Sequence, residues 1–120
     1  MLEQVEGLPD GVIGFEAVGR LSAEDYEKTL IPVANAMLAQ GKKLRFLYFV
    51  GPRFEGFDAG AAWDDMTWGM RHMTDFEKVA FVSDHTMLNG AMKPLAMLMP
   101  STFQVFAVTD LDAAKKWLAT

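Results

Sequence analysis

Three short segments of this chain are almost continuously apolar, and each is separated from the next by a longer segment with helical periodicity. The apolar segments are residues 44–50, 79–82 and 103–108. Such runs are typical of strands that are covered on both faces. Helices between them favour right-handed crossovers and a mostly parallel sheet. This pattern constrains the fold more than any other feature of the sequence.

The N-terminal part predicts a β-hairpin. Two apolar runs, residues 2–8 and 12–21, flank the turn sequence Pro-Asp-Gly at residues 9–11. Turn residues between apolar runs are typical of a hairpin. The second run does not alternate cleanly between apolar and polar residues, which predicts either burial on both of its faces or a bulge at Gly14.

Helical windows complete the expected order of elements. Ser22 is placed to cap the first helix, Pro32 predicts a kink or a new start within it, and Gly41 is expected to end it. The other windows are residues 58–73, 86–99 and 111–118. The chain therefore predicts one α/β domain over residues 1–120, with the order ββαβαβαβα and a mostly parallel sheet of four or five strands.

Composition excludes several classes of protein. The 120 residues include 11 basic and 16 acidic side chains, and the net charge of −5 argues against a broad electrostatic grip on nucleic acid. The lack of cysteine excludes disulfides, thiolate nucleophiles and iron–sulfur ligation. No apolar run reaches the length of about 18 residues that marks a membrane span. Without a signal-peptide pattern, we expect a cytoplasmic protein.

The window at residues 58–73 comes nearest to a catalytic or metal site. Asp64, Trp68 and His72 recur at four-residue spacing, which indicates either an acid–aromatic–imidazole site or a solvated face. We favour the solvated face, because no nucleophile with a base partner accompanies His72 and either Asp64 or Asp65. No further acid or histidine completes a metal site, so neither a metal nor a cofactor is expected. The predicted sheet-facing residues are Ala62, Met66, Gly69, Met70 and Met73.

Two other segments hold residue types of active sites without the required arrangement. Ser83, Asp84 and His85 include the residue types of a catalytic triad, but a triad needs side chains from separate elements. We expect Ser83 or Asp84 to bind the following amides instead. The segment 51–58 follows the central strand, where α/β proteins gather ligands, but it matches no phosphate-binding loop.

The window at residues 86–99 is apolar around almost its whole circumference, and only Asn89 and Lys93 clearly favour water. Such a helix has to bury its outer side against a subunit partner, a lipid-like ligand beneath it or a membrane surface, unless ordinary core packing hides it. Gly90 and Pro94 weaken the helix, which would let it move as a lid. The predicted sheet-facing residues are Leu88, Ala91, Leu95 and Leu98, and those off this face are Met87, Met92, Met97 and Met99.

The order of these segments resembles the SpoIIAA-like family, which is related to STAS and CRAL-TRIO domains. The resemblance covers nearly the whole chain, and its most specific residues are FEGFD at 54–58, WDD at 63–65, Gly69, His72 and DFEKVA at 75–80. It implies a β-α superhelix. CRAL-TRIO relatives imply an apolar ligand and membrane association, whereas STAS relatives imply a protein-interaction module. Residues 56–62 contain no serine or threonine, so the phosphorylation switch of STAS relatives does not carry over.

We therefore expect a non-enzymatic domain that binds a hydrophobic, lipid-like ligand between the windows 58–73 and 86–99. The methionine-rich helix would contact membranes reversibly, as in a peripheral membrane protein. The alternative is a STAS-like protein-interaction or homodimerisation module that uses the same helix. Arg71 or His72 is expected to meet a ligand head group. The residues predicted to line the cavity are Phe54, Phe57, Trp63, Met66, Met70, Met87, Met92 and Met97.

Overall fold

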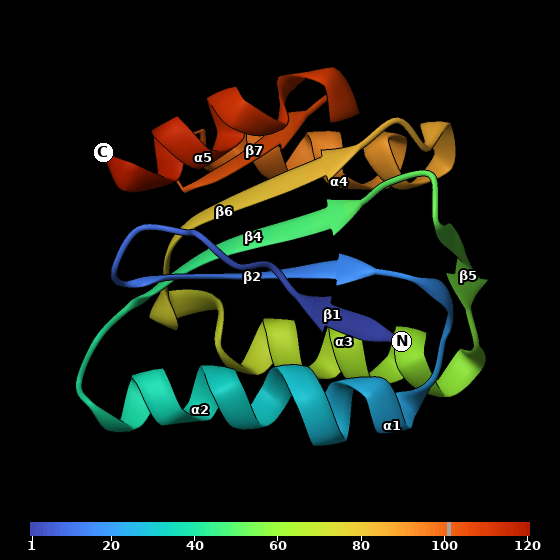
Figure 1. Ribbon diagram of the computed structural model, residues 1–120, viewed down its shortest axis with the longest axis horizontal. Helices are drawn as coiled ribbons and strands as arrows, with labels where there is room; N and C mark the ends of the chain where they lie inside the picture. The colour runs from blue at the N-terminus through green and yellow to red at the C-terminus, as the bar shows by residue number, and fades with distance from the viewer. Residues whose placement is uncertain (101) are drawn as a thin grey trace.

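The computed structural model describes residues 1–100 and 102–120, without the side chains of residues 65 and 66. The molecule is built on a five-stranded sheet with the strand order β1-β2-β4-β6-β7 (Figure 1). The first pair is antiparallel and the other three are parallel. In chain order the elements are β1 (Leu2–Gln4), β2 (Val12–Ala17), β3 (Gly19–Leu21), α1 (Ala23–Asp25), the π-helix η1 (Tyr26–Leu30), α2 (Ile31–Ala39), β4 (Leu44–Val50), β5 (Phe54–Phe57), α3 (Ala59–Arg71), η2 (Met73–Asp75), β6 (Phe76–Ser83), α4 (Thr86–Leu98), β7 (Phe103–Phe106), η3 (Val108–Asp110) and α5 (Leu111–Ala119).

This architecture confirms the mostly parallel α/β fold predicted from the alternation of apolar and helical segments. The central strand β4 has its predicted bounds. Strand β6 begins at Phe76, three residues earlier than expected, because Phe76 and Lys78 already pair with β4. Strand β7 ends at Phe106 because the chain turns into η3 at Val108.

A short second sheet, formed by β3 and β5, was not predicted. The sequence predicts a loop at the position of β5 and one continuous strand that includes both β2 and β3. The second predicted run, residues 12–21, is divided into β2, which ends at Ala17, and β3, which begins at Gly19 with φ +66° and pairs with β5 in parallel. The amide of Gly19 donates to the carbonyl of Arg53 at 2.7 Å. Strand β5 therefore occupies part of the segment 51–58 and lies beyond the carboxyl end of β4 (Figure 1).

The structure of β2 decides between the two explanations for its irregular apolar pattern, which were burial on both faces and a bulge at Gly14. The strand pairs with β4 in continuous register, with Gly14 opposite Leu47. Five of its six residues are buried. Burial on both faces, and not a bulge at Gly14, therefore explains its irregular pattern.

The first helical segment begins, restarts and ends where the sequence predicts. Ser22 and Asp25 form a capping box, in which the Ser22 amide donates to the Asp25 carboxylate at 2.8 Å. Pro32 lies in the first turn of α2, directly after η1, where its fixed φ suits a helix start. Gly41 follows the end of α2 with φ +77°, a conformation that favours glycine.

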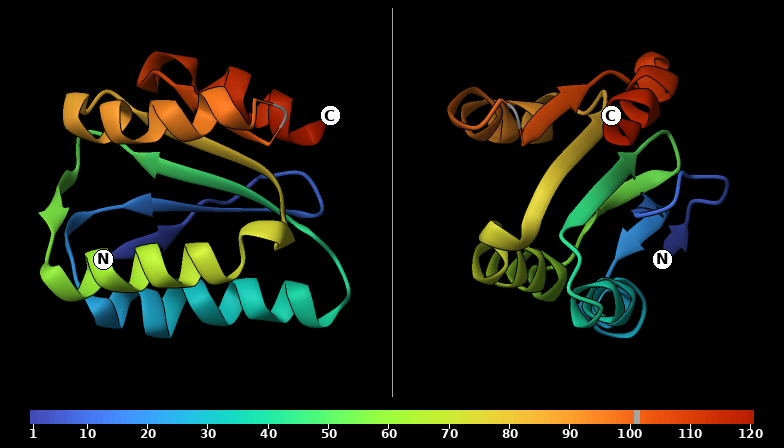
Figure 2. Two further views of the ribbon diagram at one scale, coloured as in Figure 1. Left: turned by 180° about the vertical axis from the view of Figure 1, so that it is seen from behind. Right: turned by 90° about the vertical axis from the view of Figure 1, so that its left-hand side faces the viewer.

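Helices cover both faces of the main sheet. Helices α2, α3 and α4 cover one face and α5 covers the other (Figure 2). The alternation of side chains along β4 explains this division, because successive residues point to opposite faces. Phe46 and Tyr48 join the core under the three helices, whereas Leu47 packs with Ala114 and Leu118 of α5.

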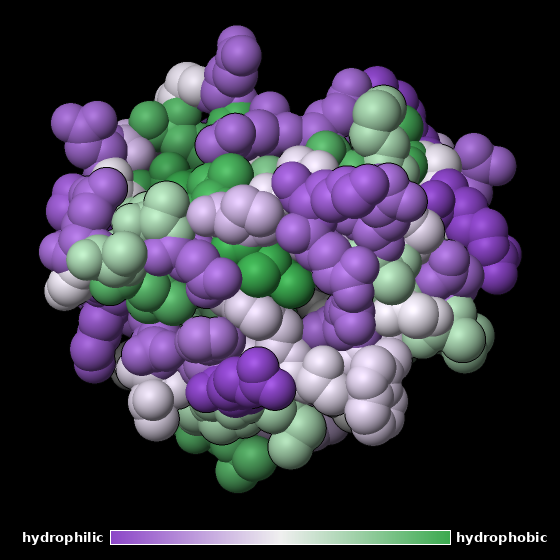
Figure 3. Space-filling model, turned by 90° about the horizontal axis from the view of Figure 1, so that it is seen from below, coloured by the Kyte–Doolittle hydropathy of each residue, from purple (hydrophilic) through white to green (hydrophobic). Residues whose placement is uncertain are grey.

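Helix α3 is turned relative to the prediction because it also packs against α1. A Cβ atom at Gly60 would lie 3.1 Å from the Cβ of Ala23, and Ala61 is fully buried. Ala62, Met70 and Met73, predicted to face the sheet, are exposed instead. On the underside formed by α1, α2 and α3, hydrophilic residues surround smaller hydrophobic areas (Figure 3).

Helix α4 also presents a different face from the predicted one. Leu88, Met92 and Leu95 are half-buried, whereas Ala91 and Leu98 are exposed. None of its side chains is fully buried. The predicted face was therefore partly wrong, since two of its four residues lie in solvent.

A hydrogen bond explains the rotation of α4. The side-chain amide of Asn89 donates to the carbonyl of Ser83 at 2.6 Å, which holds Asn89 toward the sheet. Asn89 was expected to favour water but is half-buried. In the described part of the chain, no helix combines the length and the apolar character needed to cross a membrane.

Candidate functional site

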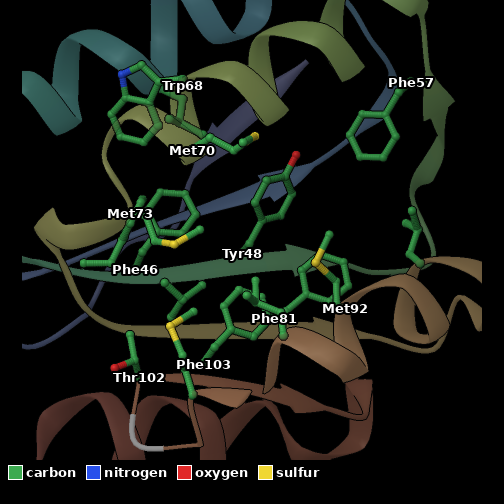
Figure 4. A pocket seen from close by; sticks show the side chains of 17 residues that line it. Phe46, Tyr48, Phe57, Trp68, Met70, Met73, Phe81, Met92, Thr102 and Phe103 are labelled. Carbon is green, nitrogen blue, oxygen red and sulfur yellow. The ribbon is translucent and has the colours of Figure 1, made fainter. Parts of the chain in front are cut away.

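An apolar pocket of about 390 Å³ lies between α3 and α4 (Figure 4). Strands β4, β6 and β7 form its floor, and Phe57 of β5 lies at one end. None of the seventeen lining residues carries a charged side chain. They are Leu30, Phe46, Tyr48, Phe57, Trp68, Gly69, Met70, Met73, Phe76, Val79, Phe81, Leu88, Met92, Leu95, Met99, Thr102 and Phe103.

The sequence leaves this space unfilled at Gly69, which lies on the pocket side of α3. A Cβ atom built at Gly69 would meet no other atom within 4 Å. Across the pocket, Met92 of α4 is only half-buried. Helices that cover a sheet otherwise pack closely on it, so an open pocket of this size over the sheet is a specific feature of the molecule.

The floor of the pocket is anchored through two tyrosines to the helical layer that covers the same face of the sheet. The hydroxyl of Tyr48 on β4 is hydrogen-bonded to the hydroxyl of Tyr26 in η1. Both residues are buried, at 7% and 1% exposure. Tyr48 therefore contributes an apolar ring to the pocket while its polar group is bound within the protein.

Three of the eight predicted lining residues, Phe57, Met70 and Met92, line the pocket. Met70 lies at the rim, since it is 67% exposed. Trp63 is 64% exposed and is not among the lining residues, because the rotation of α3 turns it away from the sheet.

Met87 and Met97 also lie outside the pocket, on the outer side of α4. They are 80% and 82% exposed. With Ala91, Pro94 and Leu98 they form an apolar surface that we call the outer face of α4. Lys93 is the single charged residue of this helix.

Phe54 lines a neighbouring hollow instead of the main pocket. Its ring packs against that of Phe57 with centroids 4.9 Å apart, and the hollow also contacts Asp84 and His85. The side chain of Met66 lies outside the described residues.

The two predicted head-group residues do not line the pocket. Nδ1 of His72 lies 2.9 Å from Oδ2 of Asp75, and the imidazole packs on the Trp68 ring with centroids 4.6 Å apart. Arg71 is exposed. Asp64, Trp68 and His72 are half-buried, so the solvated face predicted for them was wrong. The Trp68 ring packs between His72 and Phe76 of β6, with the Trp68 and Phe76 centroids 5.8 Å apart.

Ser83, Asp84 and His85 form turn hydrogen bonds and do not converge as a triad. Oγ of Ser83 accepts from the amide of His85 at 2.9 Å, as predicted for a residue at this turn. The carboxylate of Asp84 accepts from the amide of Val108 at 3.0 Å. Among the described side chains, no group of three or more histidines and acids is placed to hold a metal.

The sequence reasoning missed the strand residues that make the floor. Phe46 and Tyr48 are two apart on β4, and Phe81 and Phe103 occupy neighbouring strands. Residues two apart on a strand point to one face. The spacing of aromatic residues within the apolar runs was therefore a usable signal for the floor of the pocket.

Comparison with known proteins agrees with this architecture. The model of the SpoIIAA-like family matches residues 12–119. The chain belongs to the SpoIIAA-like family. This SpoIIAA-like chain is similar to the crystal structure of an uncharacterized protein with a SpoIIAA-like fold from Shewanella loihica PV-4. The two share 26% identity and a TM-score of 0.73, over 98% of this chain and 92% of that one. No curated protein sequence matches it. The family and the fold predicted for this SpoIIAA-like domain are thus confirmed.

Proposed function

We propose that this chain is a non-enzymatic domain that binds a hydrophobic small molecule in the pocket between α3 and α4. The observation that carries the proposal is an uncharged pocket of about 390 Å³ beneath a helix without a fully buried side chain. Pockets for small molecules have volumes of about 300–1,000 Å³ and are mostly apolar. Each buried CH₂ group contributes about 0.8 kcal/mol, so eight of them give about 6 kcal/mol before ordering costs.

The second part of the proposal is reversible contact with a membrane through the outer face of α4. Met87, Met97 and Leu98 are each at least 80% exposed. Exposed apolar groups on a surface helix gain free energy when they enter the boundary between lipid head groups and acyl chains. Because α4 separates the pocket from this surface, an outward shift of the helix would open the pocket toward the lipid.

Native mass spectrometry of the purified chain tests ligand binding. We expect a bound apolar compound on the wild-type chain and its loss in Gly69→Leu, whose new side chain would occupy the pocket. Gly90→Leu is the matched control, because Gly90 is an exposed glycine of α4 with no atom near a built Cβ. Equal retention of the compound by Gly69→Leu would contradict a site in this pocket.

The exposure of the outer face of α4 also supports a second candidate, a protein-interaction or homodimerisation module. Two copies of this face would bury the same methionines against each other. Light scattering separates the candidates: a stable dimer that becomes monomeric in Met97→Asp favours the second. A monomer at all concentrations favours the binding domain.

A further inference from the structure

The floor and one wall of the pocket form a continuous series of aromatic rings. In order these are Trp68, Phe76, Phe46, Tyr48 and Phe81. Their successive centroids lie 5.8, 6.2, 5.9 and 5.9 Å apart, with interplanar angles of 80°, 82°, 59° and 52°. Every neighbouring pair is therefore steeply inclined, so the cavity is bounded by both faces and edges of rings (Figure 4).

Rings and thioethers also bound the rest of the pocket. Phe57 lies at one end and Phe103 on the strand opposite α3 (Figure 4). Met73 and Met92 add sulfur atoms to the lining. Thioethers make favourable contacts with aromatic ring edges, and inclined rings gain attraction beyond the area that they bury. A flat aromatic ring bound in the pocket would be attracted both by the thioethers and by the inclined rings. A saturated chain would gain free energy only from the burial of its apolar surface.

Charge restricts the ligand further. Among the lining residues, the side-chain polar groups are the hydroxyls of Tyr48 and Thr102 and the indole nitrogen of Trp68, and no cation is present. A carboxylate transferred into such surroundings loses its hydration without gaining a counter-charge. The affinity of the pocket for a ligand with a carboxylate is therefore expected to be lower than for an uncharged analogue.

We propose that this pocket selects an uncharged ligand that carries a planar aromatic ring system, an inference that rests on the proposed binding function. The volume of about 390 Å³ sets the size. An apolar cavity of about 150 Å³ accepts one benzene ring, so this pocket has room for two or three fused rings.

Competition against a neutral fluorescent probe, N-phenylnaphthylamine, tests the selectivity. Naphthol and decahydronaphthol form a matched pair with the same carbon skeleton and hydroxyl group, and naphthoate adds a charge. After correction for octanol–water partition, naphthol is expected to bind about fivefold more tightly than decahydronaphthol. Naphthoate is expected to bind at least about tenfold more weakly than naphthol.

Strand β7 offers a matched pair of variants. Phe103 lines the pocket, whereas Phe106 packs against Trp117 on the other face with centroids 5.9 Å apart. Phe103→Leu should lower the preference for naphthol over decahydronaphthol, and Phe106→Leu should leave it unchanged.

The outcomes separate this inference from the proposed function. Equal corrected affinities for naphthol and decahydronaphthol, or equal affinities for naphthol and naphthoate, would overturn the selectivity while binding itself stands. An equal response of the ratio to Phe103→Leu and Phe106→Leu would overturn it as well. Absence of binding by the probe and every compound would overturn both proposals.

Discussion

The hydroxyl groups of Tyr26 and Tyr48 form a buried hydrogen bond that joins η1 to the floor of the pocket on β4. The bond connects residues 22 positions apart in the sequence. It holds the helical layer of α1 and α2 to the sheet at the place where the apolar pocket begins. The two tyrosines therefore provide a hydrogen-bond partner for each other's buried hydroxyl group while their rings pack in the core.

Removal of one of these hydroxyls is expected to destabilise the fold. Tyr26→Phe should lower the free energy of unfolding by about 1 kcal/mol, because a buried hydroxyl loses one of its partners. The double variant with Tyr48→Phe should cost less than the sum of the single variants. Urea unfolding of the four proteins measures this coupling, and strict additivity would contradict a direct interaction.

The capping box predicts a dependence of stability on pH. Burial acts to raise the pKa of Asp25, but the Ser22 amide and the charged amino group of Met1 outweigh it, and the pKa lies below its ordinary value of 3.8. The carboxylate therefore stabilises the folded state above pH 3.8, and this contribution is lost as the pH falls through the lowered pKa.

Asp25→Asn tests this dependence. At neutral pH it should lower the free energy of unfolding by up to about 1 kcal/mol, the usual contribution of a helix cap. The difference from wild type should shrink in acid. Asp10→Asn, in the exposed turn, controls for the loss of one negative charge. A difference that grows on acidification would show that the sign is wrong.

We expect the outer face of α4 to contact membranes and to contribute little to the stability of the fold. Met97→Asp combined with Leu98→Asp should lower the free energy of unfolding by only about 1 kcal/mol, the cost of two acids in the last turn of a helix, because both side chains are exposed. The same pair should reduce flotation with phosphatidylcholine vesicles. Ala36→Asp, on the exposed side of α2, is a control for added charge. Failure of the wild-type chain to float at any lipid composition would contradict the membrane part of the proposal.

Replacement of Gly69 by alanine is expected to stabilise the fold. Gly69→Ala should raise the free energy of unfolding by about 1 kcal/mol, because alanine favours a helix and the new Cβ meets open space. Gly90→Ala should show the same gain of helix propensity outside the pocket. Thermal unfolding compares the two, and a loss of stability in Gly69→Ala alone would argue that the space beside Gly69 is occupied.

The order of strands and helices was predictable because it depends on local patterns. Apolar runs mark buried strands wherever they lie, and Ser22, Pro32 and Gly41 act on the backbone within a few residues. The short sheet of β3 and β5 was not predictable in this way. It depends on a pairing between segments more than thirty residues apart, and its strands are too short to show a period.

The faces of α3 and α4 were harder to predict for a different reason. Tertiary contacts select which apolar side is buried when a helix has more than one. Gly60 and Ala61 turn α3 toward α1, and Asn89 turns α4 through its bond to Ser83. The position of the cavity between the two helices was anticipated, but the residues that line it depend on these rotations.

Titration of the wild-type chain, Gly69→Leu and Gly90→Leu with N-phenylnaphthylamine tests whether a ligand binds between α3 and α4. We expect saturable binding at one site in the wild-type chain and in Gly90→Leu, and a loss of at least about tenfold in affinity in Gly69→Leu. The same affinity in all three proteins, or no saturable binding to the wild-type chain, would contradict a ligand site between α3 and α4.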